Sequence, residues 1–221
     1  GLTNKNIAEN LKKADSIPST PRRAITDYER EILLKVLKGH RGEIFCYLML
    51  YAGLRPQEAI ALLWRDIDLQ NEFISINKAL KSEGVIKNEP KSSAGRRKIP
   101  IQLPLLKILS ENKKEPNDYV CVNLKGNRYT KKTYTTMWEN IRRLMDIEMG
   151  AEVYRNEIVK SVVADDFVIY NLRHTFCTDL QSAGVPINVA RELMGHGSID
   201  ITSKIYTHHS EISISDALEK M

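Results

Sequence analysis

Apolar residues recur at helical spacing over much of the chain, and the first such stretch follows a polar N-terminal segment. In ITDYEREILLKVL, Thr26 stands directly before the pattern and Glu29 three residues later, a capping box that predicts a helix start. GEIFCYLMLYAG is almost wholly apolar and predicts a buried helix that ends at Gly53. PQEAIALLW predicts a further helix with Pro56 in its first turn.

The pattern then changes from a helical period to a period of two. NEFISIN, GVIKNEP and GRRKIPI, between residues 71 and 101, are short alternating or β-branched runs separated by glycine and asparagine. Such runs predict a small antiparallel sheet. LPLLKILSEN predicts a short helix after it, and DYVCVN, residues 118–123, predicts one more strand.

The second half of the chain returns to helical spacing. KKTYTTMWENIRRLMDIEMG predicts a long helix whose apolar stripe is Met137, Ile141, Leu144 and Met145. Residues 151–168 show no clear period. From residue 170 onward, NLRHTFCTDLQSAG, PINVARELMG, SIDITSKIYTH and SISDALEKM predict helices in quick succession.

These elements predict an α+β fold that is mainly helical and carries a small antiparallel β-sheet. Residues 1–24 are polar and contain Pro18 and Pro21, so we interpret them as a linker or the remnant of an N-terminal domain. Residues 25–221 are expected to form one domain.

Charge narrows the choice of partner. The net charge is +5 and the sequence pI is about 9.0, which favours a polyanion. Basic residues concentrate between residues 78 and 98, where seven face two acids, and again over residues 125–132. A solvated face is the alternative reading of both clusters. Within them, the candidate DNA-binding residues are Lys87, Arg96, Arg97, Lys98, Lys131 and Lys132.

Several protein classes are disfavoured. No apolar run approaches the roughly 18 to 20 residues of a membrane span, and no signal peptide is apparent, so we expect a cytoplasmic protein that does not enter a membrane. Cys46, Cys121 and Cys177 are far apart and lie in apolar runs, which indicates buried free thiols rather than disulfides or a zinc site. Neither carboxylate clusters at metal-ligand spacing nor a glycine-rich phosphate loop is present, so we expect no metal and no cofactor.

Three motifs carry candidate chemistry. AGLRPQEAIALLWRDID places Arg55 at a helix start, with Glu58 three residues later. YNLRHTF contains Arg173 and His174, and LMGHGSIDITSKIYTHH places His196 ten residues before Tyr206. Each motif alone is weak, because a single arginine, histidine or tyrosine most often serves packing or the surface.

In this order, the motifs resemble the catalytic domain of the tyrosine recombinases, the phage integrase family, from about Ile25 to the C-terminus. The resemblance implies that Tyr206 is the nucleophile, that Arg55 and Arg173 are the two family arginines, and that His196 is the late histidine. The family's hairpin lysine falls on Lys91 in EPKSSAGRRKIP, with Lys87 as the alternative.

The resemblance further implies that a tyrosine hydroxyl attacks a DNA phosphodiester and forms a 3′-phosphotyrosyl intermediate. Two arginines suit the developing negative charge, since a guanidinium binds phosphate oxygens bidentately and stays charged. Lys91 would protonate the leaving 5′ oxygen. His196 would bind the phosphate, His174 would support it or share in proton transfer, and Glu58 would orient an arginine.

One position departs from the family pattern. Tyr170 stands where most members have a histidine, three residues before Arg173. A tyrosine keeps a hydroxyl that can donate a hydrogen bond, but it does not become a cation near neutral pH. Our hypothesis is that Tyr170 is an active-site variant with a hydrogen-bonding role, and a packing tyrosine is the alternative.

The function predicted from the resemblance is that of a site-specific DNA recombinase or integrase of a mobile element or prophage. Its expected partners are double-stranded recombination sites, three further copies of itself in a homotetramer on DNA, and accessory DNA-bending proteins. The alternatives are a chromosome-dimer resolvase, a type IB topoisomerase, and a non-catalytic DNA-binding protein on the same fold.

Overall fold

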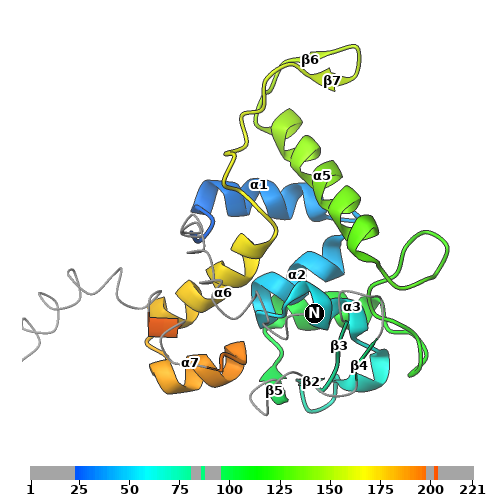
Figure 1. Cartoon of the computed structure of the whole chain (residues 1–221), viewed down its shortest axis with the longest axis vertical. Helices are drawn as coiled ribbons and strands as arrows, with labels where there is room; N and C mark the ends of the chain where they lie inside the picture. The colour runs from blue at the N-terminus through cyan, green and yellow to red at the C-terminus, as the bar shows by residue number, and fades with distance from the viewer. Residues whose placement is uncertain (1–22, 81–85, 88–95, 198–201, 204–221) are drawn as a thin grey trace, which may run out of the picture.

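The structure is a computed structural model that describes residues 23–80, 86–87, 96–197 and 202–203 (Figure 1). Its first half contains the helices α1 (Asp27–Leu37), α2 (Glu43–Ala52) and α3 (Pro56–Ala61), a short 3₁₀ turn η2 (Trp64–Asp66), and α4 (Leu103–Glu111). Its second half contains α5 (Lys131–Glu148), α6 (Tyr170–Ser182) and α7 (Ile187–Met194). The prediction of a mainly helical α+β fold is therefore confirmed.

The predicted antiparallel sheet is present and small. Strands β1 (Ile67–Asp68), β2 (Phe73–Ile76) and β5 (Arg97–Pro100) form one three-stranded sheet in the order β1-β2-β5. Strands β3 (Ala79–Leu80) and β4 (Ile86–Lys87) form a separate antiparallel pair. In β5, residues alternate between buried and exposed, so one face of the strand belongs to the core.

Two details differ from the sequence prediction. DYVCVN is no strand, since its backbone makes only the isolated bridges Leu63 to Tyr119 and Val122 to Arg128. Residues 151–168, which show no period, contain the two-residue strands β6 (Val153–Tyr154) and β7 (Glu157–Ile158). Figure 1 shows this hairpin beyond the end of α5, away from the body of the molecule.

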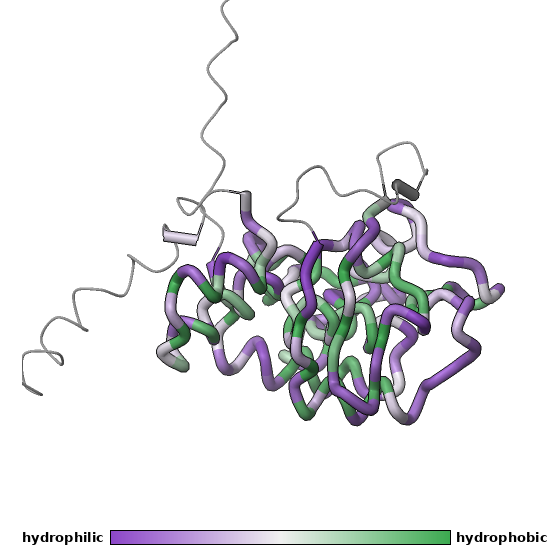
Figure 2. The backbone as a smooth tube through the Cα atoms, turned by 90° about the horizontal axis from the view of Figure 1, so that it is seen from below, coloured by the Kyte–Doolittle hydropathy of each residue, from purple (hydrophilic) through white to green (hydrophobic). Residues whose placement is uncertain are grey.

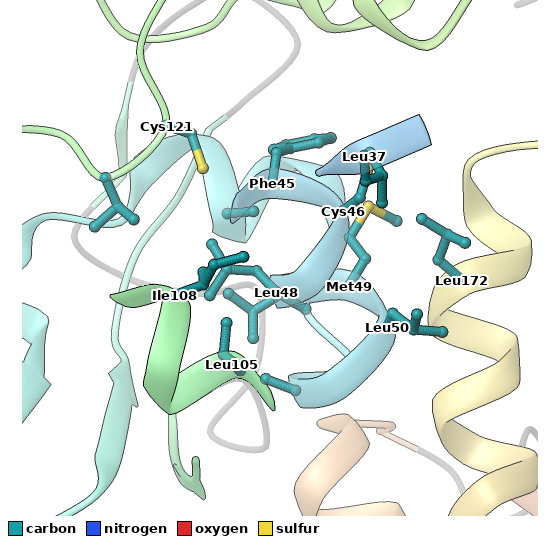
Figure 3. Packing of buried hydrophobic residues seen from close by; sticks show 14 of the residues in the cluster. Leu37, Phe45, Cys46, Leu48, Met49, Leu50, Leu105, Ile108, Cys121 and Leu172 are labelled. Atoms are coloured by element: carbon teal, nitrogen blue, oxygen red, sulfur yellow. The ribbon is translucent and has the colours of Figure 1, made fainter. Parts of the chain in front are cut away.

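Helix α2 is the centre of the core. Phe45, Cys46, Leu48 and Met49 are at most 1% exposed, and Figure 3 shows α4 and α6 packed on either side of the helix. Figure 2 shows the same division along the backbone, with hydrophobic segments gathered inside and hydrophilic ones along the outer loops. Burial of these apolar side chains is the main driving force for the fold.

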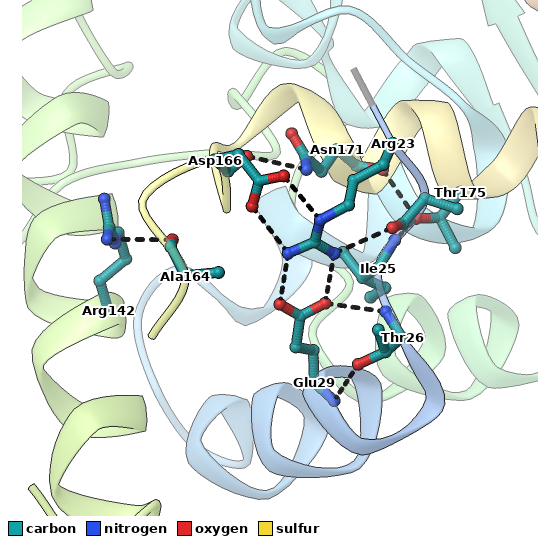
Figure 4. A network of polar contacts seen from close by, with 10 residues as sticks. Arg23, Ile25, Thr26, Glu29, Arg142, Ala164, Asp166, Asn171 and Thr175 are labelled. Carbon is teal, nitrogen blue, oxygen red and sulfur yellow. Dashed lines mark hydrogen bonds and ion pairs between the residues drawn. The ribbon is translucent and has the colours of Figure 1, made fainter. Parts of the chain in front are cut away.

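The capping box at the start of α1 is confirmed. The Thr26 hydroxyl accepts from the Glu29 amide at 3.1 Å, and the Glu29 carboxylate accepts from the Thr26 amide at 2.8 Å. Arg23, assigned to the linker from the sequence, donates to Glu29 at 2.6 Å and to Asp166 at 2.8 Å (Figure 4). Together with the bond from the Ile25 amide to Thr175, these contacts join α1 to the start of α6.

No helix in the described part of the chain is both long and apolar enough to cross a membrane. The predicted helices SIDITSKIYTH and SISDALEKM lie outside the described residues, apart from the helical pair 202–203.

Candidate active site

The candidate site forms where several element ends meet. The C-terminal end of α2, the start of α3, the first residue of β5, the first turn of α6 and the C-terminal end of α7 all contribute groups to it. Two left-handed glycines stop the helices there: Gly53 after α2, with φ +60°, and Gly195 after α7, with φ +61°. The amide of each capping glycine bonds to a carbonyl near the end of its helix, and the carbonyls that follow can accept other donors.

Gly53 is needed for a second reason. A Cβ atom at this position would lie 2.3 Å from Cδ1 of Phe176 on α6, so α2 and α6 approach more closely here than any side chain allows. The Gly53 carbonyl accepts a hydrogen bond from Nη1 of Arg173. The glycine thus brings Arg173 next to Arg55, which lies two residues further along the chain.

Glu58 is the hub of the site, although its side chain is only 5% exposed. It accepts from the backbone amide of Arg55 at 2.8 Å and from the Arg55 guanidinium at 2.8 Å. Arg97 binds the same carboxylate with both Nη atoms, at 3.0 and 2.9 Å. Nη1 of Arg173 lies 3.8 Å from it. Three guanidinium groups therefore surround one carboxylate, which leaves the cluster with a net charge of +2.

The same three arginines cap the end of α7. Arg97 donates through Nε to the carbonyl of Leu193 at 2.7 Å, Arg173 donates to that of Met194, and Arg55 donates to that of Gly195 at 2.8 Å. Three consecutive carbonyls at a helix C-terminus carry partial negative charge, so they are favourable partners for cations. His196 follows directly, and this arrangement fixes the backbone that carries it.

The electrostatics of the site follow from burial and from these neighbours. Burial opposes ionisation of Glu58, but the hydrogen bonds and charge of Arg97, with Arg173 and Arg55, lower its pKa to about 2. Burial, followed by the charges of Arg55 and Arg97, lowers the pKa of Arg173, which still remains a cation at neutral pH.

His196 is buried beside these cations. Burial and then the positive charges of Arg173, Arg55 and Arg97 lower its pKa to about 3, so the imidazole is neutral at pH 7. Its Nδ1 lies 2.9 Å from the hydroxyl of Thr202. The sequence analysis did not identify Thr202, because a single threonine six residues after a histidine is no recognisable signal.

The structure brings together most of the predicted site residues that it describes. Arg55, Glu58, Arg173 and His196 share one cluster. Tyr170 is the half-buried first residue of α6 and lies one turn before Arg173. Among the groups that affect the pKa of Arg173, Tyr170 raises it and has the smallest effect. His174 is half-buried on the same helix. Tyr206, Lys91 and the side chain of Lys87 lie outside the described residues.

Arg97 requires a correction. The sequence analysis grouped it with the DNA-binding residues, but its side chain is only 2% exposed and is held by Glu58 and Leu193. Alternation along β5 explains the difference, since Arg97 shares the core face with Ile99, whereas Arg96 and Lys98 are exposed. The period of two could have revealed this from the sequence. Lys131 and Lys132 are exposed in the first turn of α5.

The described residues include no group of three or more histidine, cysteine, aspartate or glutamate side chains arranged to hold a metal ion. The cluster instead offers guanidinium and imidazole groups, which are suited to an anion such as a phosphodiester.

Comparison with known proteins gives consistent matches. The model of the phage integrase family matches residues 24–212. The chain is 28% identical to the tyrosine recombinase XerC-like protein of Caldanaerobacter subterraneus over 93% of this chain and 57% of that protein. It is 24% identical to the transposase from transposon Tn916 of Enterococcus faecalis, over 88% of this chain and 49% of the transposase.

A solved structure shows the same fold. The Tn1549 transposon integrase in complex with transposon right end DNA superposes with a TM-score of 0.73 at 22% identity, covering 93% of this chain and 68% of the integrase. The chain spans about half to two thirds of the length of the curated relatives that it matches.

Proposed function

The chain belongs to the phage integrase family, and we propose that it is the catalytic part of a site-specific DNA recombinase or integrase of a mobile element. In the proposed reaction, it breaks and rejoins DNA strands through a 3′-phosphotyrosyl intermediate on Tyr206. The observation that best supports this function is the cluster of Arg55, Arg173 and His196 around buried Glu58, because its net positive charge suits a phosphodiester.

Arg55 and Arg173 are the proposed phosphate clamp. As the tyrosine oxygen adds to phosphorus, negative charge grows on the non-bridging oxygens, and pre-positioned donors stabilise that charge most effectively in a water-poor site. Arg55 has a side chain that is 33% exposed, so it can reach a ligand from its present place. Arg173 is buried and uses two N–H groups on the Gly53 and Met194 carbonyls, which leaves other N–H groups of its guanidinium for the phosphate.

His196 is proposed as a neutral hydrogen-bond donor to the phosphate. If the Thr202 hydroxyl donates to Nδ1, the ring proton resides on Nε2, and that N–H is then available to an oxygen. The low pKa of the His196 imidazole in the absence of DNA supports a neutral ring before DNA binds. A bound phosphate would raise this pKa by adding negative charge.

The covalent step would proceed as follows. Oη of Tyr206 attacks phosphorus and loses its proton, the bond between phosphorus and the 5′ oxygen breaks, and Lys91, with Lys87 as the alternative, gives a proton to that oxygen. The new phosphotyrosyl ester retains the energy of the phosphodiester, so the free 5′ hydroxyl of another strand can reverse the step without ATP. His174 would support the phosphate or the proton transfer.

Tyr170 is proposed to assist this site through its hydroxyl. Its place one turn before Arg173 supports this role, since residues three apart share a helix face. Tyr170→Phe and Tyr170→His separate the hydroxyl from the ring. A rate for the Phe variant equal to that of the wild type would remove the hydroxyl from the mechanism.

Double-stranded recombination sites are the proposed substrate. The exposed cations Arg96, Lys98, Lys131 and Lys132 would contact the phosphate backbone, the last two at a helix N-terminus that itself favours anions. We further propose a homotetramer on paired sites in the cytoplasm, with accessory DNA-bending proteins. The residue 1–24 segment would link this domain to a preceding one.

The test is covalent capture on nicked duplex DNA from the ends of the element that encodes the protein. The full-length protein should give a protein–DNA band that survives denaturation, and Tyr206→Phe should give none while still binding the DNA. Clear DNA binding without an adduct from the wild type would contradict the proposal and favour a non-catalytic DNA-binding protein.

A further inference from the structure

Resting on the recombinase function proposed above, we propose that Arg97 is a positioning residue. It holds Glu58 and the end of α7 in place, so that Arg55 and Arg173 can turn to the scissile phosphate without losing the geometry of the site. In this role Arg97 acts through its protein partners and does not itself touch DNA.

The contacts of Arg97 carry this inference. Both Nη atoms bind the two oxygens of Glu58 in a fork, and Nε donates to the Leu193 carbonyl. Its side chain is 2% exposed, against 33% for Arg55. A planar guanidinium held at three points and removed from solvent is a fixed element of the site rather than a mobile ligand-binding group.

The two hydrogen bonds from Arg97 determine how strongly Glu58 binds the other two arginines. A buried carboxylate is costly unless it is paired, and among the described residues Arg97 is the one whose guanidinium binds both oxygens of Glu58. Without Arg97, the Glu58 carboxylate would have unpaired oxygen lone pairs, and Arg55 and Arg173 would form stronger hydrogen bonds and ion pairs with it. The two clamp arginines would then be neutralised by the protein before a phosphate arrived.

The bond to Leu193 has a mechanical consequence. The carbonyls of Leu193, Met194 and Gly195 each accept from a different arginine. In the proposed reaction Arg55 and Arg173 serve the phosphate as well as this turn, whereas Arg97 binds only protein groups and anchors the turn to strand β5 throughout. His196 directly follows Gly195, the last residue of this turn, so its position relative to the phosphate depends on that anchor.

Four variants of the full-length protein test the inference. Arg97→Met removes both the positive charge of Arg97 and its pair of hydrogen bonds to Glu58. Arg97→Lys keeps the positive charge but cannot form that pair of hydrogen bonds. Glu58→Gln, alone and combined with Arg97→Met, removes the carboxylate that Arg97 holds. Lys107→Gln is the control, because it makes the same charge change at an exposed position on α4. Adduct formation in a single turnover and DNA affinity are measured separately on the nicked duplex.

We expect Arg97→Met to slow adduct formation by about 10²-fold, the scale of losing one transition-state donor, while DNA affinity changes by less than about threefold. Arg97→Lys should recover part of the rate. The double variant should be about tenfold faster than Arg97→Met alone, because Glu58 can no longer capture the clamp arginines. A purely structural role would not give this recovery. Lys107→Gln should react like the wild type.

Two kinetic results would overturn the inference: a wild-type rate of adduct formation for Arg97→Met, or a double variant no faster than Arg97→Met. The titration of Glu58 by NMR gives a readout that does not need DNA cleavage. Its pKa, about 2 in the wild type, should rise in Arg97→Met, and an unchanged value would also contradict the inference. Absence of an adduct from the wild type would instead count against the proposed function, while the titration would still test Arg97.

Discussion

Replacement of Gly53 by alanine should damage both the fold and the site. Gly53 combines a positive φ of +60° with a close approach to Phe176, whose Cδ1 would lie 2.3 Å from the new Cβ. Gly39 provides a matched control, since its φ is +73° and nothing lies within 4 Å of a Cβ built there. Gly39→Ala therefore reports the backbone strain alone, and Gly53→Ala reports the strain together with the clash.

The magnitudes follow from these two terms. An alanine in the left-handed region costs about 1–2 kcal/mol, which is the loss expected for Gly39→Ala. Overpacking against the Phe176 ring adds about 1–3 kcal/mol, so Gly53→Ala should lose about 2–5 kcal/mol of unfolding free energy. For a chain of this size, the larger loss corresponds to a decrease of about 4–20 °C in Tm.

Urea unfolding followed by circular dichroism measures both free energies, and adduct formation on nicked DNA reports the site. Gly53→Ala should also slow adduct formation at temperatures where it remains folded, because the Gly53 carbonyl holds Arg173. Adding Phe176→Leu should recover part of the lost stability. Equal losses of unfolding free energy for Gly39→Ala and Gly53→Ala would refute the close contact of α2 with α6.

Three further results are expected. The pKa of His196 is lowered in the folded state, so the unfolded state binds more protons below about pH 6.5 and the protein loses stability as the pH decreases. His196→Gln should remove about 2 kcal/mol of the loss of unfolding free energy that urea unfolding measures between pH 7 and pH 5. Equal pH dependence in both proteins would contradict this. Asp146 accepts from one hydroxyl and two amides in residues 161–163, so Asp146→Ala should lose about 1–3 kcal/mol of unfolding free energy, and an unchanged value would show that the loop does not need it. Burial raises the pKa of all three cysteine thiols, so a colourimetric thiol reagent should label them only after unfolding, whereas rapid labelling of the native protein would contradict their burial.

Local signals in the sequence predicted the helical part of the fold well. The capping box of Thr26 and Glu29 and the terminal Gly53 mark helix ends by chemistry that depends only on nearby residues. The strand predicted at DYVCVN failed because β-branched content does not reveal whether a partner strand is available. The hairpin β6–β7 was missed because each strand has only two residues, too few to show a period.

The site was predictable in composition but not in geometry. The motifs identify Arg55, Glu58, Arg173 and His196, and the structure brings these together. The role of Arg97 depends on which face of β5 meets α7, and its charge favoured the surface interpretation. The capping of α7 by three arginines depends on contacts between residues about 20 to 140 positions apart, which no local pattern encodes.

The most direct test of the central claim is to locate the covalent bond. The adduct is digested with nuclease and trypsin, and the peptide that retains a nucleotide is identified by mass spectrometry. Cleavage after Lys204 gives IYTHHSEISISDALEK, in which Tyr206 is the only tyrosine, and cleavage after Lys160 gives SVVADDFVIYNLR, which contains Tyr170. We predict a nucleotide 3′-phosphate on Tyr206. A nucleotide on the Tyr170 peptide, or on a serine, would contradict the assignment of the nucleophile.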